Sequence, residues 1–494
     1  MDETKFHRAL KWSYVMNWGQ QIISAALSFI LAAILGPSDF GLLAIAMVYI
    51  LFIHMFLDQG LVAAIIQRKE LSPDHLDSVF WLVQGVCVVL VVLAILLSGT
   101  WAAANHAPKL ALILFWLSIT IPIESLAVVQ KAVLQREMDF RSLSIRTNLS
   151  VIGGGLVGII GAFSGFGVWS LVAQQIATNS LALVMLWKLS HWRPRLRFSY
   201  PRLRELFHFS MANFVAKLGV FTNAQVNVLL MGIFFGPLAV GLYRFAAKAM
   251  STFFQLSQFS LLSVSLPEFS RWQDDPVRLR QSVLACIRLC GALTIPALAG
   301  LAATSDLVMG MVGPEWLDAG ACLRVLCVLG MFDGFAQFAG PLLQAVNRPK
   351  LLAGLSWLQT ALNASLLATA AVLLRGSSDR KVVVGVSLTQ LLSLFVIGMP
   401  LALYSLKRFC NITLFDVLRK LTPSILAGAA TVAVVLVPQY LGVFLGWKPV
   451  FALSILILIG APVGIAVLLA LDLETRSMLG KFIPSFASKE SQGS

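Results

Sequence analysis

Apolar runs of about 20 residues recur along almost the whole chain, and this pattern limits the possible folds more than any other feature. A helix of that length crosses the hydrocarbon core of a bilayer, because each residue advances the helix by about 1.5 Å. The runs begin near Trp12 and end near Leu471, and charged residues make up only 12% of the chain. The sequence therefore predicts an all-α membrane protein and excludes an ordinary soluble enzyme.

We predict about fourteen transmembrane helices, joined by connections too short to form an extramembrane domain. The predicted spans are 12–35, 41–66, 78–98, 109–130, 146–165, 167–187, 208–235, 239–265, 281–303, 319–342, 351–374, 382–405, 421–441 and 449–471. The first span is too long for the apolar region of a signal peptide and lacks a small-residue cleavage pattern. We therefore expect it to be retained.

The basic residues predict the orientation of the chain. With the N-terminus inside, 28 of the 37 Lys and Arg residues fall in inside segments and five fall in outside loops. Such a bias marks the cytoplasmic side of a membrane protein. We interpret the net charge of +14 as loop charge that orients the chain, not as a nucleic-acid-binding surface. Both termini are expected to be cytoplasmic.

Two halves of the chain repeat short motifs. Residues 35–42, LGPSDFGL, align with residues 235–242, FGPLAVGL, and residues 132–136 echo residues 345–348. Each pair occupies the same place in the predicted topology. We therefore predict two pseudo-symmetric six-helix lobes, with substrate binding between them. The predicted domains are residues 1–200 (spans 1–6), residues 201–405 (spans 7–12) and residues 406–494 (two extra spans and a cytoplasmic tail).

Basic and polar residues inside the spans need an explanation, because a charge at the bilayer centre costs at least about 2.5 kcal/mol. In the eighth predicted span, polar residues recur from Arg244 to Gln258 at the spacing of one helix face. They indicate either the lining of a cavity or structural ion pairs and snorkelling side chains. The predicted substrate-binding residues are Lys217, Arg244, Lys248, Arg324, Asn17, Gln20, Asn213 and Gln255.

Titratable groups inside the spans suit ion or proton coupling, because their protonation can be linked to a conformational change. The candidates are Asp58, Glu124, Asp333 and His54. The acids equally suit static pairing with Lys217 or Lys248. The six cysteines lie in or beside apolar segments without a ligand spacing, so we predict no metal site and no cofactor.

Cavity cations favour a large anionic head group, since lysine and arginine bind phosphate well. Apolar walls would suit a lipid tail that stays in the bilayer. The residues thus favour transport of an amphipathic anion, without identifying that anion.

Several stretches resemble a known family. Residues 35–41 and 58–68, DQGLVAAIIQR, are similar to its first two spans, and residues 134–141, LQREMDFR, are similar to its loop after the fourth span. Residues 165–172, GFGVWSLV, are similar to the entry of its sixth span. The family is that of the Wzx-type polysaccharide exporters, the PST branch of the MATE-like MOP superfamily. The likeness is dense over residues 10–185 and fainter over residues 205–405.

The resemblance implies a flippase and not an enzyme. It would move undecaprenyl-pyrophosphate-linked oligosaccharide repeat units across the bacterial cytoplasmic (inner) membrane by alternating access, for export of lipopolysaccharide or exopolysaccharide. Its implied partners are the lipid-linked oligosaccharide, membrane lipid and polysaccharide polymerase or chain-length proteins. Two alternatives stay open: a MATE-type drug or cation antiporter, which would need an acidic cavity, and a membrane-embedded glycan polymerase or ligase, which would need a larger outside loop.

Overall fold

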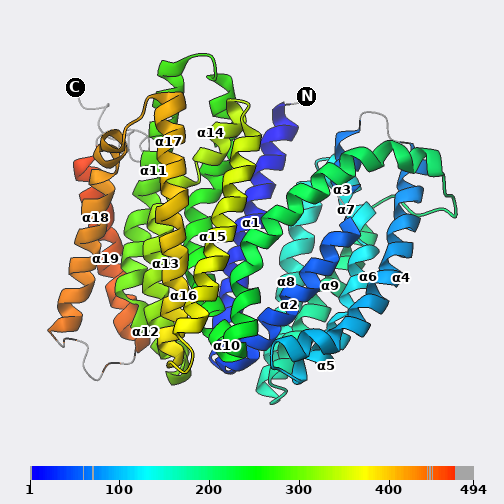
Figure 1. Cartoon of the computed structure of the whole chain (residues 1–494), viewed down its shortest axis with the longest axis horizontal. Coiled ribbons are helices and arrows are strands. Elements are labelled where there is room, and N and C mark those ends of the chain that lie inside the picture. Colours follow the sequence, from blue (N-terminus) through cyan, green and yellow to red (C-terminus); the bar gives the residue numbers. More distant parts are fainter. Residues whose placement is uncertain are drawn as a thin grey trace, which may run out of the picture. The chain divides into compact units, whose positions relative to one another are not determined.

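The computed structural model describes residues 3–58, 61–68, 72–441, 443, 447 and 449–472. Every regular element within these ranges is a helix, as Figure 1 shows. The predicted all-α fold is therefore confirmed. Within the interior of each described helix, backbone hydrogen bonds satisfy the backbone polar groups, as a lipid environment requires.

Ten helices occupy the first part of the chain. They are α1 (Glu3–Ala32), α2 (Pro37–Asp58), α3 (Leu61–Gln67), α4 (Pro73–Ala104), α5 (Lys109–Leu117), α6 (Thr120–Ser125), α7 (Val128–Arg136), α8 (Phe140–Phe163), α9 (Val168–Leu189) and α10 (Tyr200–Arg271). The helix α10 holds two predicted spans, which are separated by non-helical backbone at Gly236 (φ 77°, ψ −174°).

The second part continues from α11 to α19. Its helices are α11 (Pro276–Ala303), α12 (Ser305–Val312), the 3₁₀ turn η1 (Pro314–Trp316), α13 (Leu317–Ala336), α14 (Ala339–Ala345), α15 (Pro349–Leu373), α16 (Asp379–Ser393), the π-helical turn η2 (Leu394–Gly398), α17 (Met399–Cys410), α18 (Leu414–Tyr440) and α19 (Pro449–Leu471). The π-helical turn joins α16 to α17 without a loop, so the two helices form one long apolar segment.

The number of membrane-crossing helices is consistent with the prediction. Among the described residues, 11 helices are long and apolar enough to cross a membrane, or 12 if the bent pair Lys109–Ser125 and Val128–Arg136 forms one span. The helix α1 is not among them, although it overlaps residues 12–32 of the first predicted span. One of the 11, Phe221–Leu256, contains the break at Gly236 and so combines parts of two predicted spans.

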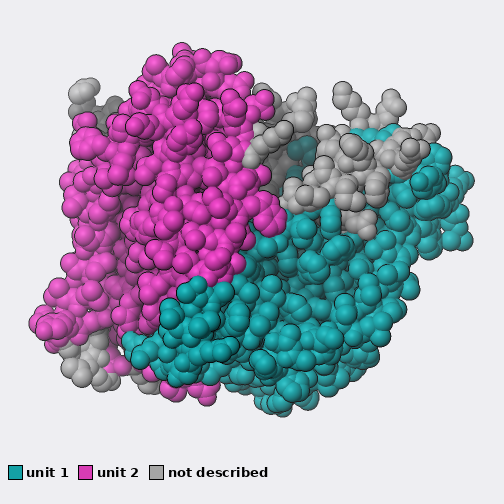
Figure 2. All heavy atoms as spheres, in the orientation of Figure 1, with its two compact units in different colours: residues 1–245, 367–383 teal, residues 246–366, 384–494 magenta. Residues whose placement is uncertain are grey.

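The chain forms two compact units, which Figure 2 shows in different colours. Unit 1 comprises Met1–Phe245 and Leu367–Val383, and unit 2 comprises Ala246–Leu366 and Val384–Ser494. These units are defined by packing, whereas the predicted domains 1–200, 201–405 and 406–494 are defined by repeated topology. The predicted domain limits therefore stay a prediction.

Several helices begin where a side chain satisfies free backbone N–H groups. The Asp139 carboxylate accepts a hydrogen bond from the backbone N–H of Ser142 (3.1 Å) at the start of α8. The Asp275 carboxylate accepts from two N–H groups at the start of α11. The first four N–H groups of a helix have no partner inside it, so such acceptors fix the position at which the helix begins.

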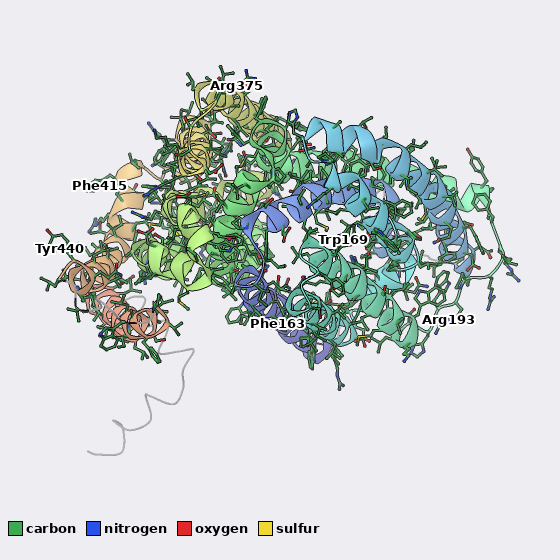
Figure 3. All side chains as sticks on the ribbon, turned by 90° about the horizontal axis from the view of Figure 1, so that it is seen from below. Phe163, Trp169, Arg193, Arg375, Phe415 and Tyr440 are labelled. Carbon is green, nitrogen blue, oxygen red and sulfur yellow. The ribbon has the colours of Figure 1, made fainter. Side chains whose placement is uncertain are left out.

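The outer surfaces of the helices are apolar. Phe163, Phe415 and Tyr440 are 75%, 73% and 93% exposed, and Figure 3 shows them pointing away from the ribbon. In α19 the exposed side chains include Ile457 (55%) and Leu458 (72%). A soluble protein would bury most of these groups, whereas a lipid environment accepts them. The exposed surface thus agrees with a membrane protein.

The two copies of the repeated motif contact each other within unit 1. A Cβ atom built on Gly41 would lie 1.7 Å from the carbonyl oxygen of Pro237. A Cβ atom built on Gly241 would lie 1.8 Å from the carbonyl oxygen of Pro37. The backbones of α2 and α10 therefore approach so closely that only glycine fits at either position. We name this reciprocal contact the glycine crossing.

Arg136, at the end of α7, binds the end of the short helix α3. Its Nη1 donates hydrogen bonds to the carbonyl oxygens of Ile65 (2.7 Å) and Arg68 (2.5 Å). The last carbonyls of a helix lack partners inside it and carry partial negative charge, so a guanidinium is a favourable cap. This contact explains why an arginine is useful in the loop motif of residues 134–141.

We predict that Gly41→Ala and Gly241→Ala each destabilise the protein by about 1–3 kcal/mol or prevent its folding, because a methyl group would collide with a carbonyl oxygen. The control is Gly85→Ala, since a Cβ atom on Gly85 of α4 meets nothing within 4 Å. Thermal unfolding of the purified protein in detergent measures the effect. Equal stability of all three variants would contradict the close approach.

We also predict that Arg136→Met lowers the free energy of unfolding by about 2 kcal/mol, because it removes charged hydrogen bonds to the carbonyls of α3 while keeping the apolar stem. Arg348, its counterpart in the repeat, is exposed. Arg348→Met is therefore the matched control and should change stability by less than about 0.5 kcal/mol. Similar losses in both variants would show that Arg136 does not stabilise the protein through these carbonyls.

Candidate functional site

Arg244 is a cation inside a span of unit 1. It lies on α10 eight residues after Gly236, about 12 Å along the helix axis. The next residue, Phe245, is buried and packs against the rings of Phe29 and Phe40, with 5.0 Å and 6.1 Å between centroids. Arg244 is half-buried, and no carboxylate of the described residues forms an ion pair with it. Its charge is therefore not neutralised by a neighbouring acid in this part of the structure.

The predicted polar stripe continues along α10 into unit 2. Lys248 lies one turn beyond Arg244 and is half-buried, and Gln255 is exposed. Gln258 is only 1% exposed, and its amide nitrogen donates to the Cys290 thiol at 3.0 Å. The stripe thus begins with accessible groups and ends in the core of unit 2, so Gln258 packs inside the protein.

For five other predicted site residues, the structure describes little of the side-chain surroundings. The side chains of Asn213, Lys217 and Asp58 lie outside the described residues, although the backbone at all three positions is helical. On α1, Asn17 is half-buried and Gln20 is exposed. The roles assigned to these residues stay predictions.

A cluster of polar and charged side chains lies inside unit 1. The His54 ring is 3.3 Å from the Thr120 hydroxyl, which joins α2 to α6. Glu124 follows Thr120 by one helical turn and interacts electrostatically with both His54 and Arg146. Arg146 also donates from Nε to the carbonyl oxygen of Ala182 on α9 (3.1 Å). The structure thus places two of the separate coupling candidates, His54 and Glu124, within electrostatic range of each other and adds Arg146, the first residue of the predicted span 146–165.

Asp333, the coupling candidate of unit 2, lies on α13. Its carboxylate accepts a hydrogen bond from the side-chain amide of Gln337 at 2.7 Å. No basic side chain in the described part of the chain forms an ion pair with it. Glu124 and Asp333, the two coupling candidates whose acidic side chains are described, therefore lie in different units and have different neighbours.

Two ion pairs of unit 2 differ in their surroundings. Arg324 contacts Asp306 with N–O distances of 2.6 and 2.7 Å, and the two side chains are 46% and 63% exposed. Arg288 of α11 contacts Asp472, just after α19, at 3.0 Å, and these side chains are only 6% and 7% exposed. Sequence reasoning proposed a substrate contact for Arg324 and none for Arg288. In the structure Arg324 forms an exposed ion pair with Asp306. Arg288 forms a buried ion pair that links α11 to the end of α19.

The cysteines and acids offer no evident metal site. Among the described residues, no group of three His, Cys, Asp or Glu side chains lies close enough to hold a metal ion. The six cysteines are free thiols, and all are buried except Cys286, which is half-buried. Buried thiols of this kind act as small apolar packing groups.

Unit 1 also contains a mainly apolar cavity of about 230 Å³ between α2, α4 and α10, which sequence reasoning missed. The Tyr49 and Trp101 rings lie 5.3 Å apart at its wall, and the Phe52 and Phe221 rings lie 5.7 Å apart. It is lined by Val48, Tyr49, Phe52, Trp101, Phe221, Thr222, Gln225, Val226 and Leu229. The cavity could not be predicted because its walls come from three distant segments of the sequence.

Comparison with known proteins identifies the family. Residues 30–321, more than half of the chain, match the family described as "Polysaccharide biosynthesis protein". The chain belongs to this family. It is 26% identical over 322 residues to the succinoglycan biosynthesis transport protein ExoT of Rhizobium meliloti (strain 1021). It is 27% identical over 327 residues to the lipopolysaccharide biosynthesis protein WzxC of Escherichia coli (strain K12).

Each of these two matches covers 65% of this chain and 65% of the relative, slightly less than two thirds of the relative's length. They confirm the resemblance to Wzx-type exporters. Among solved structures, the chain is similar to the lipid II flippase MurJ in an inward closed conformation, with a TM-score of 0.73 and 16% identity. That likeness covers 93% of this chain and 98% of MurJ, and it shows the fold.

We predict that Arg288→Gln destabilises the protein by about 3–5 kcal/mol, because it removes the guanidinium that pairs with the buried carboxylate of Asp472. Arg324→Gln is the matched control, and the loss of an exposed ion pair should cost no more than about 1 kcal/mol. Denaturation in detergent compares the two variants. Equal losses would contradict the difference in burial between the two pairs.

Proposed function

We propose that this protein flips undecaprenyl-pyrophosphate-linked oligosaccharide repeat units from the inner to the outer leaflet of a bacterial cytoplasmic membrane, by alternating access. The named relatives support the substrate class, since ExoT is a transport protein of succinoglycan biosynthesis and WzxC is a lipopolysaccharide biosynthesis protein. The fold supports movement of a lipid, because the structural neighbour MurJ is a lipid II flippase. Flipping requires no covalent chemistry, so the protein acts as a transporter and not as an enzyme.

The observation that carries this proposal is the half-buried Arg244 on α10, which has no carboxylate partner among the described side chains. A charge inside a span is costly unless something compensates it. A pyrophosphate group is a suitable partner, because guanidinium groups bind phosphate through charge-assisted hydrogen bonds. Lys248 lies one turn further on α10, and Lys217 lies on the same helix before Gly236. Arg244 is the proposed head-group contact, and Lys217 and Lys248 are proposed as further substrate-binding residues.

Energy for transport is proposed to come from an ion gradient through acids inside the spans. Glu124 interacts electrostatically with His54 of α2 and Arg146 of α8, and it is the proposed coupling residue of unit 1. Asp333 in unit 2 is bonded only by the neighbouring Gln337 among the described contacts. Protonation of such a group can be linked to a conformational change.

The proposed surroundings follow from the same substrate. The lipid part would remain in the bilayer, with the sugars carried through the protein. Both termini are proposed to be cytoplasmic, because most basic residues then lie on the cytoplasmic side. Polysaccharide polymerases and chain-length proteins are the proposed partners, since they would use the unit after it reaches the outer leaflet.

We predict that Arg244→Gln and Lys248→Gln each lower the rate of flipping at least about tenfold, which corresponds to about 1.4 kcal/mol of lost stabilisation in the rate-limiting state. Lys217→Gln should act in the same direction. The measurement is uptake of a fluorescent lipid-pyrophosphate glycan in proteoliposomes, followed by chemical quenching of the label in the outer leaflet.

The control is Arg375→Gln, because Arg375 is exposed near the end of α15 (labelled in Figure 3) and belongs to no proposed contact. Its rate should equal that of the parent protein. The proposal of a cationic head-group contact fails if Arg244→Gln, Lys248→Gln and Lys217→Gln all transport at the parent rate. Product analysis completes the test, since joined glycans would indicate a polymerase or ligase.

A further inference from the structure

The segment between α9 and α10 is basic and apolar at the same time. Residues 188–200, KLSHWRPRLRFSY, contain four Lys or Arg residues and no acid. We name this segment the basic strap. From Ser190 to Ser199 it forms no regular helix, and it follows directly the last turn of α9. Its proposed role does not depend on the proposed transport function.

The backbone of the basic strap is held against the first turns of α4. The indole N–H of Trp81 donates to the carbonyl oxygen of Arg195 (2.8 Å). The backbone N–H of Arg195 donates to the carboxylate of Asp77 (3.1 Å), which is fully buried. The backbone N–H of Ser199 donates to the hydroxyl of Ser78 (2.9 Å). The strap therefore has a fixed position on unit 1, although it is not helical.

This attachment leaves the side chains of the strap free to face outward. Leu196, Phe198 and Tyr200 are 89%, 58% and 66% exposed. Arg195 is exposed, and none of the described carboxylates forms an ion pair with its side chain. Arg197 is 64% exposed and reaches Asp74 only at 3.7 Å. The strap thus presents apolar and cationic groups side by side.

Arg193 differs from the other two arginines of the strap. Its guanidinium donates to the backbone carbonyls of Ser190 (2.6 Å) and Trp187 (2.6 Å), and it lies 5.6 Å from the centre of the Trp187 ring. These contacts satisfy the carbonyls at the end of α9. Arg193, which Figure 3 labels, is therefore a structural cap. Arg195 and Arg197 are the two arginines of the strap that are available for a ligand.

The height of the strap along the helices indicates what covers it. The candidate span in α4 begins at Pro73 and the candidate span in α9 ends at Leu189, and the strap lies beside these two helix ends, so we infer that it lies near one surface of the hydrocarbon layer. Three tryptophans, Trp81, Trp187 and Trp192, lie in or beside it, and tryptophan is enriched at the membrane–water interface. Exposed leucine and phenylalanine at this height would contact the outer ends of lipid acyl chains. The arginines would then lie at the level of the lipid phosphates.

We propose that the basic strap is a binding surface for anionic phospholipid head groups of the adjacent leaflet. Leu196 and Phe198 insert into the interface, while Arg195 and Arg197 bind lipid phosphates. Charge complementarity selects anionic over zwitterionic lipids, because the strap carries four basic residues and no acid. The hydrogen bonds to α4 hold the strap backbone in place before lipid binds. Binding therefore costs little conformational entropy of the backbone.

The experiment places an environment-sensitive fluorophore on Leu196→Cys in the full-length protein in nanodiscs. The parent protein, whose cysteines are all buried or half-buried, is labelled in parallel to subtract background. Discs contain phosphatidylcholine with increasing fractions of phosphatidylglycerol, and lipids with spin-labelled head groups act as quenchers. We expect quenching to rise with phosphatidylglycerol and to weaken at high salt.

Arg195→Gln with Arg197→Gln tests the charges. Each substitution should raise the phosphatidylglycerol fraction needed for half-maximal quenching by about fivefold. The matched control is Arg375→Gln with Arg380→Gln, two exposed arginines elsewhere in unit 1, which should leave the titration unchanged. Unchanged thermal stability of the strap variant would exclude a folding defect. Phe198→Ser tests the apolar part separately and should reduce insertion of the strap into the interface.

Three results would overturn the proposal. The label could remain in water in every disc, which would show that the strap does not touch the membrane. The arginine variant could titrate like the parent protein, which would remove the charges from the contact. Quenching could appear only after addition of a lipid-pyrophosphate glycan, which would make the strap a substrate contact rather than a surface for bulk lipid.

Discussion

A charge is costly in hydrocarbon, and the described part of the structure compensates its basic side chains in different ways. Arg288 is compensated by the buried carboxylate of Asp472, and Arg136 is compensated by backbone carbonyls at the end of α3. Arg324 lies where solvent and Asp306 are both available. Arg244 differs from these three, because among the described contacts neither a carboxylate nor a backbone carbonyl binds its side chain. A substrate with a phosphorylated head group would compensate this charge, and the proposed function follows from that difference.

Arginine takes several roles in unit 1, and burial and backbone geometry separate them. Arg136 and Arg193 end helices, because free carbonyls lie within reach of their guanidinium groups. Arg146 of α8 donates to a carbonyl of α9 and interacts electrostatically with Glu124 of α6. Arg195 has its backbone bound to α4 and its side chain exposed, so it can meet a ligand from outside. The residue type alone distinguishes none of these roles.

The sequence predicts the helices and their membrane character well, because hydrophobic length and period are local properties. It also locates the turn motifs, since glycine, proline and capping residues act on their immediate neighbours. Sequence patterns do not predict contacts between segments that are far apart in the chain. Nothing near Arg288 in the sequence indicates Asp472, and nothing near Arg146 indicates Glu124. The repeat could be recognised at Gly41 and Gly241, but their mutual contact required the fold. The roles predicted for Lys217, Asn213 and Asp58 stay predictions, because their side chains lie outside the described residues.

The glycine crossing consists of backbone atoms on both sides, which gives it a property that side-chain packing lacks. Rotamers can adjust a contact between two leucines in small steps, whereas the carbonyl oxygens of Pro37 and Pro237 move only with their helices. Each oxygen occupies the space that a methyl group would otherwise fill. A movement of α2 away from residues 237–241 of α10 would therefore open both contacts, because each of the two segments contributes one glycine and one carbonyl oxygen.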